Sequence, residues 1–398
     1  MEGTPGGDRR VFATSMRVGL NLIYLVPGET GGMEVVAREL IPALVAAAPQ
    51  VHFTAFINRE ASEEGGRAWG ELIPAVTVPV RARNRLEWVR GEQTLLPPLA
   101  ARSGVDVVHS LASTAPAWGR FRRVVTVHDL IYRFYPETHG GLRAQGMRLL
   151  VPLGARRSHR VIADSRSTRD NLVEHLRVPT EKIDVVPLGV GAARSVSAPE
   201  PDVRARYDLG ERTVVLTVSA KRPHKNLVRL LEAVALIPPE ERPVLVLPGY
   251  ATDHERELRE RARSLGVDGD TRFLQWIPSE DLEGLYALAT CFVFPSLYEG
   301  FGLPVLEAMA RGLPVACSDR SALVEVAGDA ALRFDPEDPR AIAQALTRLL
   351  DDDAERERLR RGGLEQARRF SWTAAARGVL ASYERALAGA GASAAERS

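Results

Sequence analysis

The chain has 398 residues, of which 45% are hydrophobic and 26% are charged, and its formal net charge at pH 7 is +1. This composition indicates a globular protein long enough for two domains, and the small net charge argues against a nucleic-acid binder. No run approaches 18 consecutive apolar residues, so no membrane-spanning helix is expected. Residues 1–15 are predicted to be disordered, and they contain no apolar core of a signal peptide.

Short β-branched runs alternate with helical patterns along the whole chain, which predicts α/β domains with parallel sheets. In the first half, strands are expected at Arg17–Val26, Val51–Ile57, Val105–His109, Val124–Val127, Val161–Ala163 and Ile183–Val186. In the second half, they are expected at Val214–Val218, Val244–Leu247, Arg272–Leu274, Cys291–Phe294, Pro314–Cys317 and Ala331–Phe334. The clearest helices between them are expected at Met33–Ala47, Asn226–Leu236 and Asp253–Leu265.

This order of elements predicts two Rossmann-like, doubly wound domains that face each other across a cleft, with ligands at the carboxyl ends of the strands. The first domain is expected at 16–190 and the second at 211–371, joined by a linker at 191–210 that is rich in Ala, Ser and Pro. A final helix, Trp372–Leu387, is expected to pack back on the first domain and to be followed by a disordered tail up to residue 398.

A glycine-rich turn, Gly28-Glu-Thr-Gly31-Gly32-Met33-Glu34, follows the first strand and opens the first long helix. Paired glycines at such a turn present backbone N–H groups to an anion. The spacing is not that of a dinucleotide-binding loop, and a plain tight turn explains the same residues. Gly31 and Gly32 are therefore candidates for an anion site, with the tight turn as the alternative.

His128 and Asp129 follow the buried strand at Val124–Val127. Because α/β domains bind ligands at the carboxyl ends of their strands, His128 is a candidate catalytic residue and Asp129 a second candidate. A structural histidine at a strand end is the alternative. Asp164 and Ser165 follow another strand, where they either line the same site or cap the next helix.

Three of the 52 basic residues are lysines, Lys182, Lys221 and Lys225, and the others are arginines. Two of these lysines lie in one loop, at 220–226, after the first strand of the second half. An ammonium is a compact point charge and a guanidinium a planar fork, so the two are not interchangeable at a tight phosphate site. Lys225 is therefore a candidate phosphate ligand. For Lys221 and Arg222, a solvated position is the alternative.

Two acidic runs, Asp268-Gly269-Asp270 and Asp351-Asp352-Asp353, could suggest a metal site. The first run lies in a short connection between a helix and a strand without a further acidic or histidine partner nearby. No Cys and His residues have the spacing of metal ligands either. Both runs are therefore predicted to be solvated turns, and no metal is expected.

The most informative segment is Ser296–Arg311, Ser-Leu-Tyr-Glu-Gly-Phe-Gly-Leu-Pro-Val-Leu-Glu-Ala-Met-Ala-Arg. It follows an apolar strand, and Pro304 stands where the first turn of a helix is expected to begin. A strand, a glycine loop and a helix N-terminus together favour anion binding, because free N–H groups and the helix dipole point at the gap. Two carboxylates, Glu299 and Glu307, bracket this turn and can accept hydrogen bonds from sugar hydroxyls. The alternative is a solvated Glu299 and a Glu307 that only favours the helix N-terminus.

This segment resembles the glutamate–seven residues–glutamate signature of glycosyltransferase family 4, whose members are retaining enzymes of the GT-B fold. The resemblance covers about residues 16–387. It implies that Glu299 contacts hydroxyls of the donor sugar and that Glu307 holds the nucleotide ribose. It further implies donor contacts from Gly300, Phe301, Gly302 and Leu303.

The resemblance also implies roles for residues in other loops. Lys225 would compensate the charge of the leaving diphosphate. Many members also carry an arginine six residues before this lysine, where this chain has Ser219, and Arg222 would take the place of that arginine. Gly31 and Gly32 would touch the donor diphosphate.

His128 would lie near the donor sugar and the acceptor, with Asp129 as an acceptor-binding residue. The turn 275–278 would meet the nucleotide base through Ile277, whereas Trp276 has packing as the alternative.

The sequence thus predicts a retaining glycosyltransferase that moves a hexose from a nucleoside-diphosphate sugar to a hydroxyl acceptor. No cofactor and no metal are expected, because protein cations can stabilise the charge that develops on the leaving group. GDP-mannose is the preferred donor, since family members with a comparable His-Asp-Leu segment are often mannosyl or rhamnosyl transferases. The alternatives are a nucleotide-sugar epimerase or phosphorylase of the same fold, and a non-catalytic nucleotide-sugar-binding protein.

Cys291 and Cys317 lie in apolar runs, which predicts buried thiols in a reducing, cytoplasmic compartment. Two groups of arginines suggest peripheral contact with an anionic membrane that carries a lipid acceptor, with a solvated helical face as the alternative. These arginines are found at positions 81, 83, 85 and 90, and at positions 143, 148, 156, 157 and 160.

Overall fold

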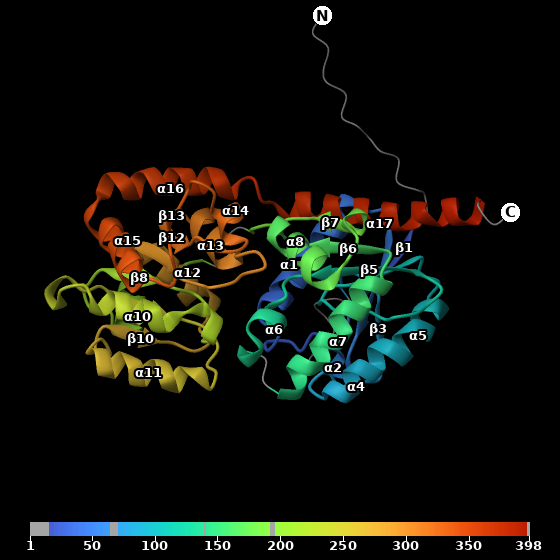
Figure 1. Cartoon of the computed structure of the whole chain (residues 1–398), viewed down its shortest axis with the longest axis horizontal. Coiled ribbons are helices and arrows are strands. Elements are labelled where there is room, and N and C mark those ends of the chain that lie inside the picture. The colour runs from blue at the N-terminus through green and yellow to red at the C-terminus, as the bar shows by residue number, and fades with distance from the viewer. Residues whose placement is uncertain (1–15, 64–70, 139–140, 192–195, 396–398) are drawn as a thin grey trace, which may run out of the picture. The chain divides into compact units, whose positions relative to one another are not determined.

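The computed structural model of the chain describes residues 16–63, 71–138, 141–191 and 196–395 (Figure 1). The predicted disorder of residues 1–15 and of residues 396–398 lies outside this part. The contacts divide the described chain into two compact units. The first unit contains the residues up to Thr126, Val151–Ile162 and the residues from Ala376 on; the second contains Val127–Leu150 and Ala163–Ala375.

The first sheet has seven strands in the order β3-β2-β1-β4-β5-β6-β7. They are β1 (Arg17–Leu22), β2 (His52–Ile57), β3 (Ala75–Thr77), β4 (Val107–Ser110), β5 (Arg122–Val127), β6 (Arg160–Ala163) and β7 (Ile183–Val185). β1 pairs in parallel with β2 on one side and with β4 on the other, and Asn21 on β1 stands opposite Ser110 on β4. The strand order reverses between β1 and β4, which is the topological switch point of this sheet.

The helical elements of this half include one π-helix, η1, between two α-helices. They are α1 (Gly32–Ala47), α2 (Arg59–Glu63), α4 (Arg85–Arg90), η1 (Gly91–Leu95), α5 (Leu96–Arg102), α6 (Ile131–Phe134), η2 (Pro136–Thr138), α7 (Gly141–Arg157), α8 (Arg166–Leu176) and η3 (Thr180–Lys182).

The second sheet has six strands in the order β10-β9-β8-β11-β12-β13. They are β8 (Val214–Leu216), β9 (Val244–Leu247), β10 (Thr271–Phe273), β11 (Cys291–Phe294), β12 (Val315–Ser318) and β13 (Leu332–Phe334). All its pairs are parallel, and the order reverses between β8 and β11. Every residue of β8, β9, β11 and β12 is buried, which explains why these strands are continuous apolar runs.

The helical elements of the second half are α9 (Glu200–Arg206), η4 (Pro223–Lys225), α10 (Leu227–Ala235), η5 (Pro239–Glu241), α11 (His254–Leu265), α12 (Ser279–Leu288), α13 (Leu303–Ala310), α14 (Leu323–Ala327), α15 (Pro339–Asp351), α16 (Asp353–Ala367) and α17 (Trp372–Ala395). The apolar face of α10 packs into a core that includes Leu230, Leu231, Ile342 and Leu346. This core covers one side of the sheet and leaves the strand ends to the loops.

The last helix, α17, is drawn in red in Figure 1, and from Ala376 on it belongs to the first unit. Inside that unit, the Tyr383 hydroxyl lies 2.7 Å from His109 Nδ1, and both side chains are fully buried. The expected end of this helix at Leu387 is wrong, because it continues to Ala395. The domain ranges predicted from the sequence, including the packing of this helix, stay predictions.

The other expectations compare closely with the structure. All twelve predicted strands overlap observed ones, whereas β3 was not predicted and α9 forms inside the predicted linker. Cys291 and Cys317 are buried free thiols. Among the described helices, none combines the length and the apolar character of a membrane span.

Candidate active site

The turn between β11 and α13 is built around Gly300 and Gly302. Gly302 has a φ of 114°, a left-handed value that favours glycine, and it directly precedes α13. A Cβ atom at Gly300 would lie 1.8 Å from the carbonyl oxygen of His128, so the two backbones can approach only because residue 300 has no side chain. Pro304 occupies the first turn of α13, as the sequence predicts. The turn therefore brings the predicted donor-binding loop against the histidine at the end of β5.

Lys225 and Glu299 form an ion pair at this turn. Lys225 Nζ lies 2.5 Å from Glu299 Oε1, and the two side chains are 15% and 10% exposed. The ammonium also lies 5.2 Å from the centre of the Phe294 ring, a cation–π contact. The two residues lie in the loops that follow β8 and β11, the neighbouring strands between which the strand order reverses. The pair therefore marks the switch point of the second sheet, where open α/β sheets bind ligands.

The turn that carries Lys225 is fixed to the glutamate loop by its backbone as well. It is a short 3₁₀ helix, Pro223–Lys225, followed by Asn226 with a φ of 60°. The buried amide of Asn226 donates to the carbonyl of Pro295 at 3.0 Å. The backbone N–H of Leu297 donates to the carbonyl of His224 at 2.8 Å. These bonds keep the ammonium and the carboxylate in place without help from a ligand.

His128 is oriented by a buried carboxylate. Its Nδ1 donates to Asp164 Oδ2 at 2.6 Å, which favours the ring tautomer that carries the proton on Nδ1. Ser165 caps α8, because its Oγ accepts the backbone N–H of Thr168 at 3.0 Å, so the capping alternative is correct for Ser165. The Thr168 hydroxyl meets the carbonyl oxygens of His128 at 3.2 Å and Gly300 at 3.1 Å. The N-terminus of α8 thus holds both segments together.

Asp129 and Arg222 are charged groups in the same neighbourhood. Burial raises the pKa of the Asp129 carboxyl, and the Glu299 carboxylate adds to this, while Lys225 opposes it. Burial lowers the pKa of the Arg222 guanidinium, and Asp129 opposes that change. Arg222 is half-buried, so its guanidinium is only partly accessible to solvent. Its predicted role in place of the arginine that is Ser219 here stays a prediction.

Lys221 is not solvated, and for this residue the alternative is wrong. Its side chain is fully buried, and its ammonium donates to the carbonyl oxygens of Gly249, at 2.6 Å, and Leu274. Burial lowers the pKa of the Lys221 amine to about 8, and the Glu255 carboxylate opposes this shift. This lysine therefore faces the protein interior, unlike the neighbouring Lys225.

The remaining donor-binding candidates lie on α13 and directly before it. Glu307 is half-buried in the second turn, and its carboxylate adds to the effect of burial in raising the pKa of the Tyr286 hydroxyl. Phe301 is buried, with its ring centre 5.7 Å from that of Phe370, which leaves its backbone for the predicted donor contact. Leu303 is the first residue of the helix. Their contacts with a donor stay predictions.

Trp276 is 67% exposed, so it is not part of the buried core, although it does pack on a neighbouring ring. Its ring stacks on that of Tyr250, with centroids 5.1 Å apart and an interplanar angle of 26°. Ile277, the predicted base-binding residue, follows it in the same loop and is half-buried.

Gly31 and Gly32 belong to the first unit. Gly31 has a φ of 67° and directly precedes α1, which begins at Gly32. The N–H of Gly28 in this turn donates to Glu34 Oε2 at 2.9 Å. One donor of the turn thus already has an anionic partner from the chain itself, and a donor-diphosphate contact stays a prediction.

The acidic runs are engaged in other ways. Asp270 pairs with Arg212 at 2.7 Å and its side chain is 19% exposed, so the expectation of a solvated turn is wrong for this residue. Asp352 caps α16 through the backbone N–H of Glu355. Among the described residues, no three His, Cys, Asp or Glu side chains are gathered as a possible metal site.

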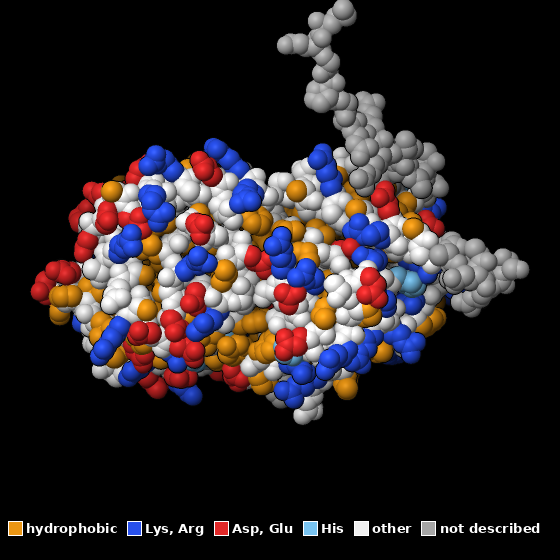
Figure 2. All heavy atoms as spheres, turned by 45° about the horizontal axis from the view of Figure 1, so that its top comes forward, with side chains coloured by type: hydrophobic (Ala, Val, Ile, Leu, Met, Phe, Trp, Pro, Cys, Tyr) orange, Lys and Arg blue, Asp and Glu red, His pale blue; other side chains and the backbone are white. Residues whose placement is uncertain are grey.

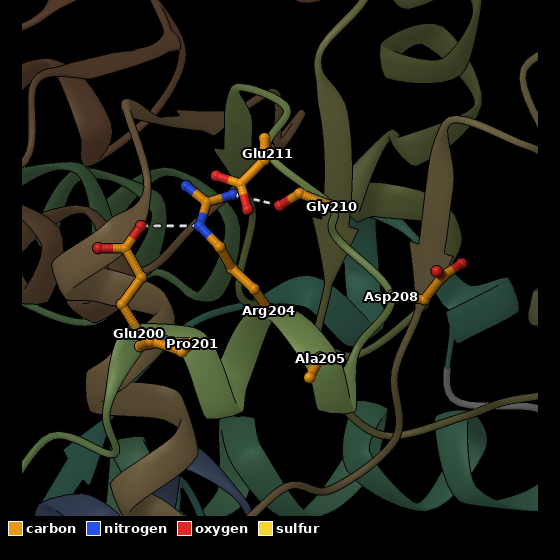
Figure 3. A pocket seen from close by; sticks show the side chains of 7 residues that line it. All are labelled: Glu200, Pro201, Arg204, Ala205, Asp208, Gly210 and Glu211. Atoms are coloured by element: carbon orange, nitrogen blue, oxygen red, sulfur yellow. Dashed lines mark hydrogen bonds and ion pairs between the residues drawn. The ribbon is translucent and has the colours of Figure 1, made fainter.

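A hollow beside α9 lies apart from these residues (Figure 3). In it, Arg204 donates from Nε to Glu200 Oε1 at 2.7 Å and from Nη1 to the carbonyl of Gly210 at 2.8 Å. It is lined by Glu200, Pro201, Arg204, Ala205, Asp208, Gly210 and Glu211. Since its arginine is already paired and none of the predicted site residues lines it, this hollow is not the predicted donor site.

Sequence reasoning missed Tyr298 as a residue that holds the site together. Its hydroxyl accepts the backbone N–H of Leu130 at 3.2 Å and the amide of Asn171 at 3.1 Å. A signal was present, because this tyrosine directly precedes Glu299 in the most informative segment. Its partners are more than 120 positions away in the chain and could not be read from it.

Comparison with known families matches both halves of the chain. A family model described as "Glycosyl transferases group 1" matches residues 200–366, and one described as "Glycosyltransferase Family 4" matches residues 30–194. O-antigen chain mannosyltransferase B of Escherichia coli is 35% identical over 255 residues, which is 63% of this chain and 67% of that protein. A D-inositol 3-phosphate glycosyltransferase of Nocardioides sp. is 35% identical over 246 residues, 57% of this chain and 54% of that protein. The chain spans only about half the length of that second relative.

Solved structures resemble the chain over almost its full length. Sucrose-phosphate synthase of Thermosynechococcus elongatus has a TM-score of 0.76 at 21% identity, covering 94% of this chain and 100% of that one. The Anabaena protein HepE in complex with UDP-glucose has a TM-score of 0.72 at 19% identity, covering 92% and 98%. These likenesses show a fold of the GT-B type, with one parallel sheet in each half.

Proposed function

The chain belongs to the group 1 glycosyltransferases of family 4, and from this premise we propose that it is a retaining enzyme that transfers a hexose from a nucleoside-diphosphate sugar to a hydroxyl acceptor. The observation that carries the proposal is the Lys225–Glu299 pair at the switch point of the second sheet. An ammonium there can hold a diphosphate, and a carboxylate beside it can accept hydrogen bonds from the sugar.

The proposed reaction is a front-face displacement. The acceptor oxygen forms a bond to the anomeric carbon on the face from which the phosphate leaves, and the bond between that carbon and the phosphate oxygen breaks. The acceptor proton passes to the departing phosphate oxygen. Negative charge grows on the diphosphate as its bond breaks, so cations that are already in place stabilise the transition state more than the ground state.

In this proposal each residue acts through a group that the fold has already oriented. Lys225 and Arg222 hold the diphosphate, Glu299 the sugar and Glu307 the ribose. His128, oriented by its bond to Asp164, lies at the reacting end. When the donor binds, Lys225 must also contact the diphosphate and Glu299 the sugar. The ion pair between them must therefore break, or the ammonium must bind the carboxylate and the diphosphate at once.

Mannose is the hexose that we propose, with GDP-mannose as the donor. Support comes from the names of relatives: O-antigen chain mannosyltransferase B of Escherichia coli, and O-antigen chain mannosyltransferase RfbU of Salmonella typhimurium, which is 27% identical over 224 residues. Thermal stabilisation by a panel of nucleotide sugars tests this choice, and a larger stabilisation by a UDP sugar would contradict it.

The experiment that tests the function measures nucleoside diphosphate released from each donor with and without hydroxyl acceptors. We expect release that depends on the acceptor, and a product whose anomeric configuration, read by NMR, is that of the donor. An epimerised sugar without an acceptor would favour the epimerase alternative. Tight donor binding without any turnover would favour a nucleotide-sugar sensor.

Peripheral membrane contact is part of the proposal for the acceptor side. Basic side chains gather along the lower right margin of the face drawn in Figure 2. Leu149 on α7 is 74% exposed beside the exposed Arg148, while Arg81 and Arg83 pair with carboxylates, and the side chain of Arg143 lies outside the described ones. Stronger binding to anionic than to neutral vesicles is expected. Equal binding to both would remove the membrane from the proposal.

A further inference from the structure

Lys221 is a charged side chain with no exposed surface, in a chain that has only two other lysines. Its ammonium donates to the carbonyl of Gly249 at 2.6 Å and to that of Leu274, and it lies 3.8 Å from Glu255 Oε2. An ammonium has three N–H donors; two of them bind these carbonyls, whereas the Glu255 carboxylate, at 3.8 Å, is an ion-pair partner and not a hydrogen-bond acceptor. The lysine is therefore held inside the protein by two hydrogen bonds and an ion pair, and without exposed surface it cannot reach a ligand itself.

The two carbonyls belong to different loops at the carboxyl edge of the second sheet. Lys221 follows β8, Gly249 follows β9, and Leu274 follows β10, three neighbouring strands of this sheet. The backbone adds to the connection: the N–H of Lys221 donates to the carbonyl of Tyr250 at 3.1 Å, and that of Gly249 to Gln275 at 3.3 Å. One ammonium thus joins three loops that the strands alone leave independent.

A lysine suits this position better than the arginine that the chain uses almost everywhere else. The ammonium is compact, whereas a guanidinium spreads five donors over a rigid plane. A buried site with two carbonyls and one carboxylate would leave donors of an arginine without partners. Such unpaired buried donors destabilise a fold, which gives a physical reason for a lysine here.

The loops that Lys221 joins carry an exposed aromatic pair. Tyr250 directly follows Gly249, and Trp276 comes two residues after Leu274. Their rings stack with centroids 5.1 Å apart, and Trp276 remains 67% exposed. Every nucleobase has a flat π-face, and stacking on an aromatic side chain is a general way to bind one.

We propose that Lys221 is a positioning residue for the donor nucleotide: by joining the loops after β8, β9 and β10, it fixes the Tyr250–Trp276 pair as a platform for the nucleobase. This inference rests on the proposed function, because it takes a nucleoside-diphosphate sugar as the ligand of this edge. Phosphate binding remains with Lys225 and Arg222. Lys221 accordingly affects how tightly the nucleoside part binds, and not the rate of transfer.

The test compares ligands with and without a base. Dissociation constants of GDP, UDP and inorganic pyrophosphate are measured for the wild type, Lys221→Met and the control Lys182→Met, which also removes one lysine. In Lys221→Met we expect the nucleotide that the wild type binds more tightly, GDP or UDP, to bind about tenfold more weakly, which is the scale of one lost base–aromatic contact. The affinity for pyrophosphate should stay unchanged. In turnover, KM for the donor should rise while kcat stays within about twofold.

A second variant covers the case in which Lys221→Met does not fold. Trp276→Ala changes an exposed side chain, and it should give the same selective loss of nucleotide binding. Equal weakening of GDP and pyrophosphate in Lys221→Met would make Lys221 a phosphate ligand and overturn the inference. Unchanged nucleotide binding in folded Lys221→Met, or in Trp276→Ala, would also overturn it. A wild type that binds neither nucleotide would overturn the proposed function as well.

Discussion

Both sheets have a switch point where the strand order reverses, but a carboxylate is bound by neutral donors at the first and paired with a cation at the second. In the first sheet, between β1 and β4, the buried carboxylate of Glu92 on the π-helix η1 accepts the amide of Asn21 at 3.1 Å and the hydroxyl of Thr114 at 2.9 Å. Gln93 donates to its other oxygen at 3.2 Å. The side chains that donate to Glu92 in the described part of the chain are thus neutral, and burial raises its pKa to about 7.

In the second sheet, between β8 and β11, the carboxylate is paired with a cation. Glu299 meets Lys225 at 2.5 Å, and Arg222 lies within electrostatic reach of Asp129 in the same unit. At the switch point of the first sheet (the first edge), a carboxylate and neutral donors hold the chain's own loops. At the switch point of the second sheet (the second edge), cations are fixed in place, which is what a site for an anion requires. The same topology therefore serves two purposes, decided by a few side chains at the strand ends.

Removal of the cation at the second edge should have the largest effect. Lys225→Met is expected to lower kcat by about 100-fold to 1000-fold, the range for one lost stabilising group in a transition state. Steady-state turnover of the preferred donor measures this. Lys182→Met is the matched control and should keep normal turnover. If Lys225→Met turned over at a normal rate, the cation would have no part in the reaction.

The second largest effect is expected when a side chain is added at Gly300, where the backbone approaches that of His128 closely. Gly300→Ala would place a Cβ atom 1.8 Å from the carbonyl oxygen of His128, and we expect the second unit to lose more than about 3 kcal/mol of stability, or turnover to fall sharply if the loop moves instead. Gly269→Ala is the control, because nothing lies within 4 Å of its Cβ position. Urea unfolding of both variants decides. Equal stability of the two would show that the 300 loop can move away from His128 at no cost.

The smallest effect is expected at the first edge and depends on pH. The pKa of Glu92 is about 7 in the folded chain and 4.5 in a free carboxyl, so the folded state holds the proton more tightly. Stability of the first unit should therefore fall as the pH rises from 4.5 to 7, by at most about 3 kcal/mol. In Glu92→Gln this fall should vanish, whereas the exposed control Glu71→Gln should keep it.

Hydrogen exchange of the β1 and β4 amides at several pH values, corrected for intrinsic exchange, measures this difference. A parallel pH profile for Glu92→Gln and the wild type would mean that Glu92 stays ionised in the fold. In that case the contrast between the two edges would rest on the second edge alone.

Much of the fold could be predicted from the sequence, because parallel strands that are buried on both faces consist of consecutive apolar residues. The turn at 296–311 was predictable for a similar reason, since glycines and a proline each have a local structural meaning. The short edge strand β3, Ala75–Thr77, carries too few residues for a pattern. The end of α17 was misjudged because small residues such as Ala388 and Ala390 were expected not to pack, although alanine favours a helix by itself.

The site was only partly predictable, because its contacts join residues far apart in the chain. The sequence indicated that Lys225, Glu299 and His128 lie at strand ends, but not that Asp164 holds the histidine. The burial of Lys221 was beyond sequence reasoning too, since a lysine after a strand can point either to the solvent or inward. Its hydrogen-bond acceptors are backbone carbonyls, which every residue has, so no pattern of side chains in the sequence predicts them.

In the proposed reaction, the Lys225 ammonium at the carboxyl end of the second sheet holds the diphosphate of the nucleotide. The most direct measurement compares the affinities of GDP and GMP, by calorimetry, in the wild type and in Lys225→Met. We expect the wild type to bind GDP more tightly than GMP, and Lys225→Met to lose most of this difference. An undiminished preference for GDP in Lys225→Met would contradict this role of the ammonium.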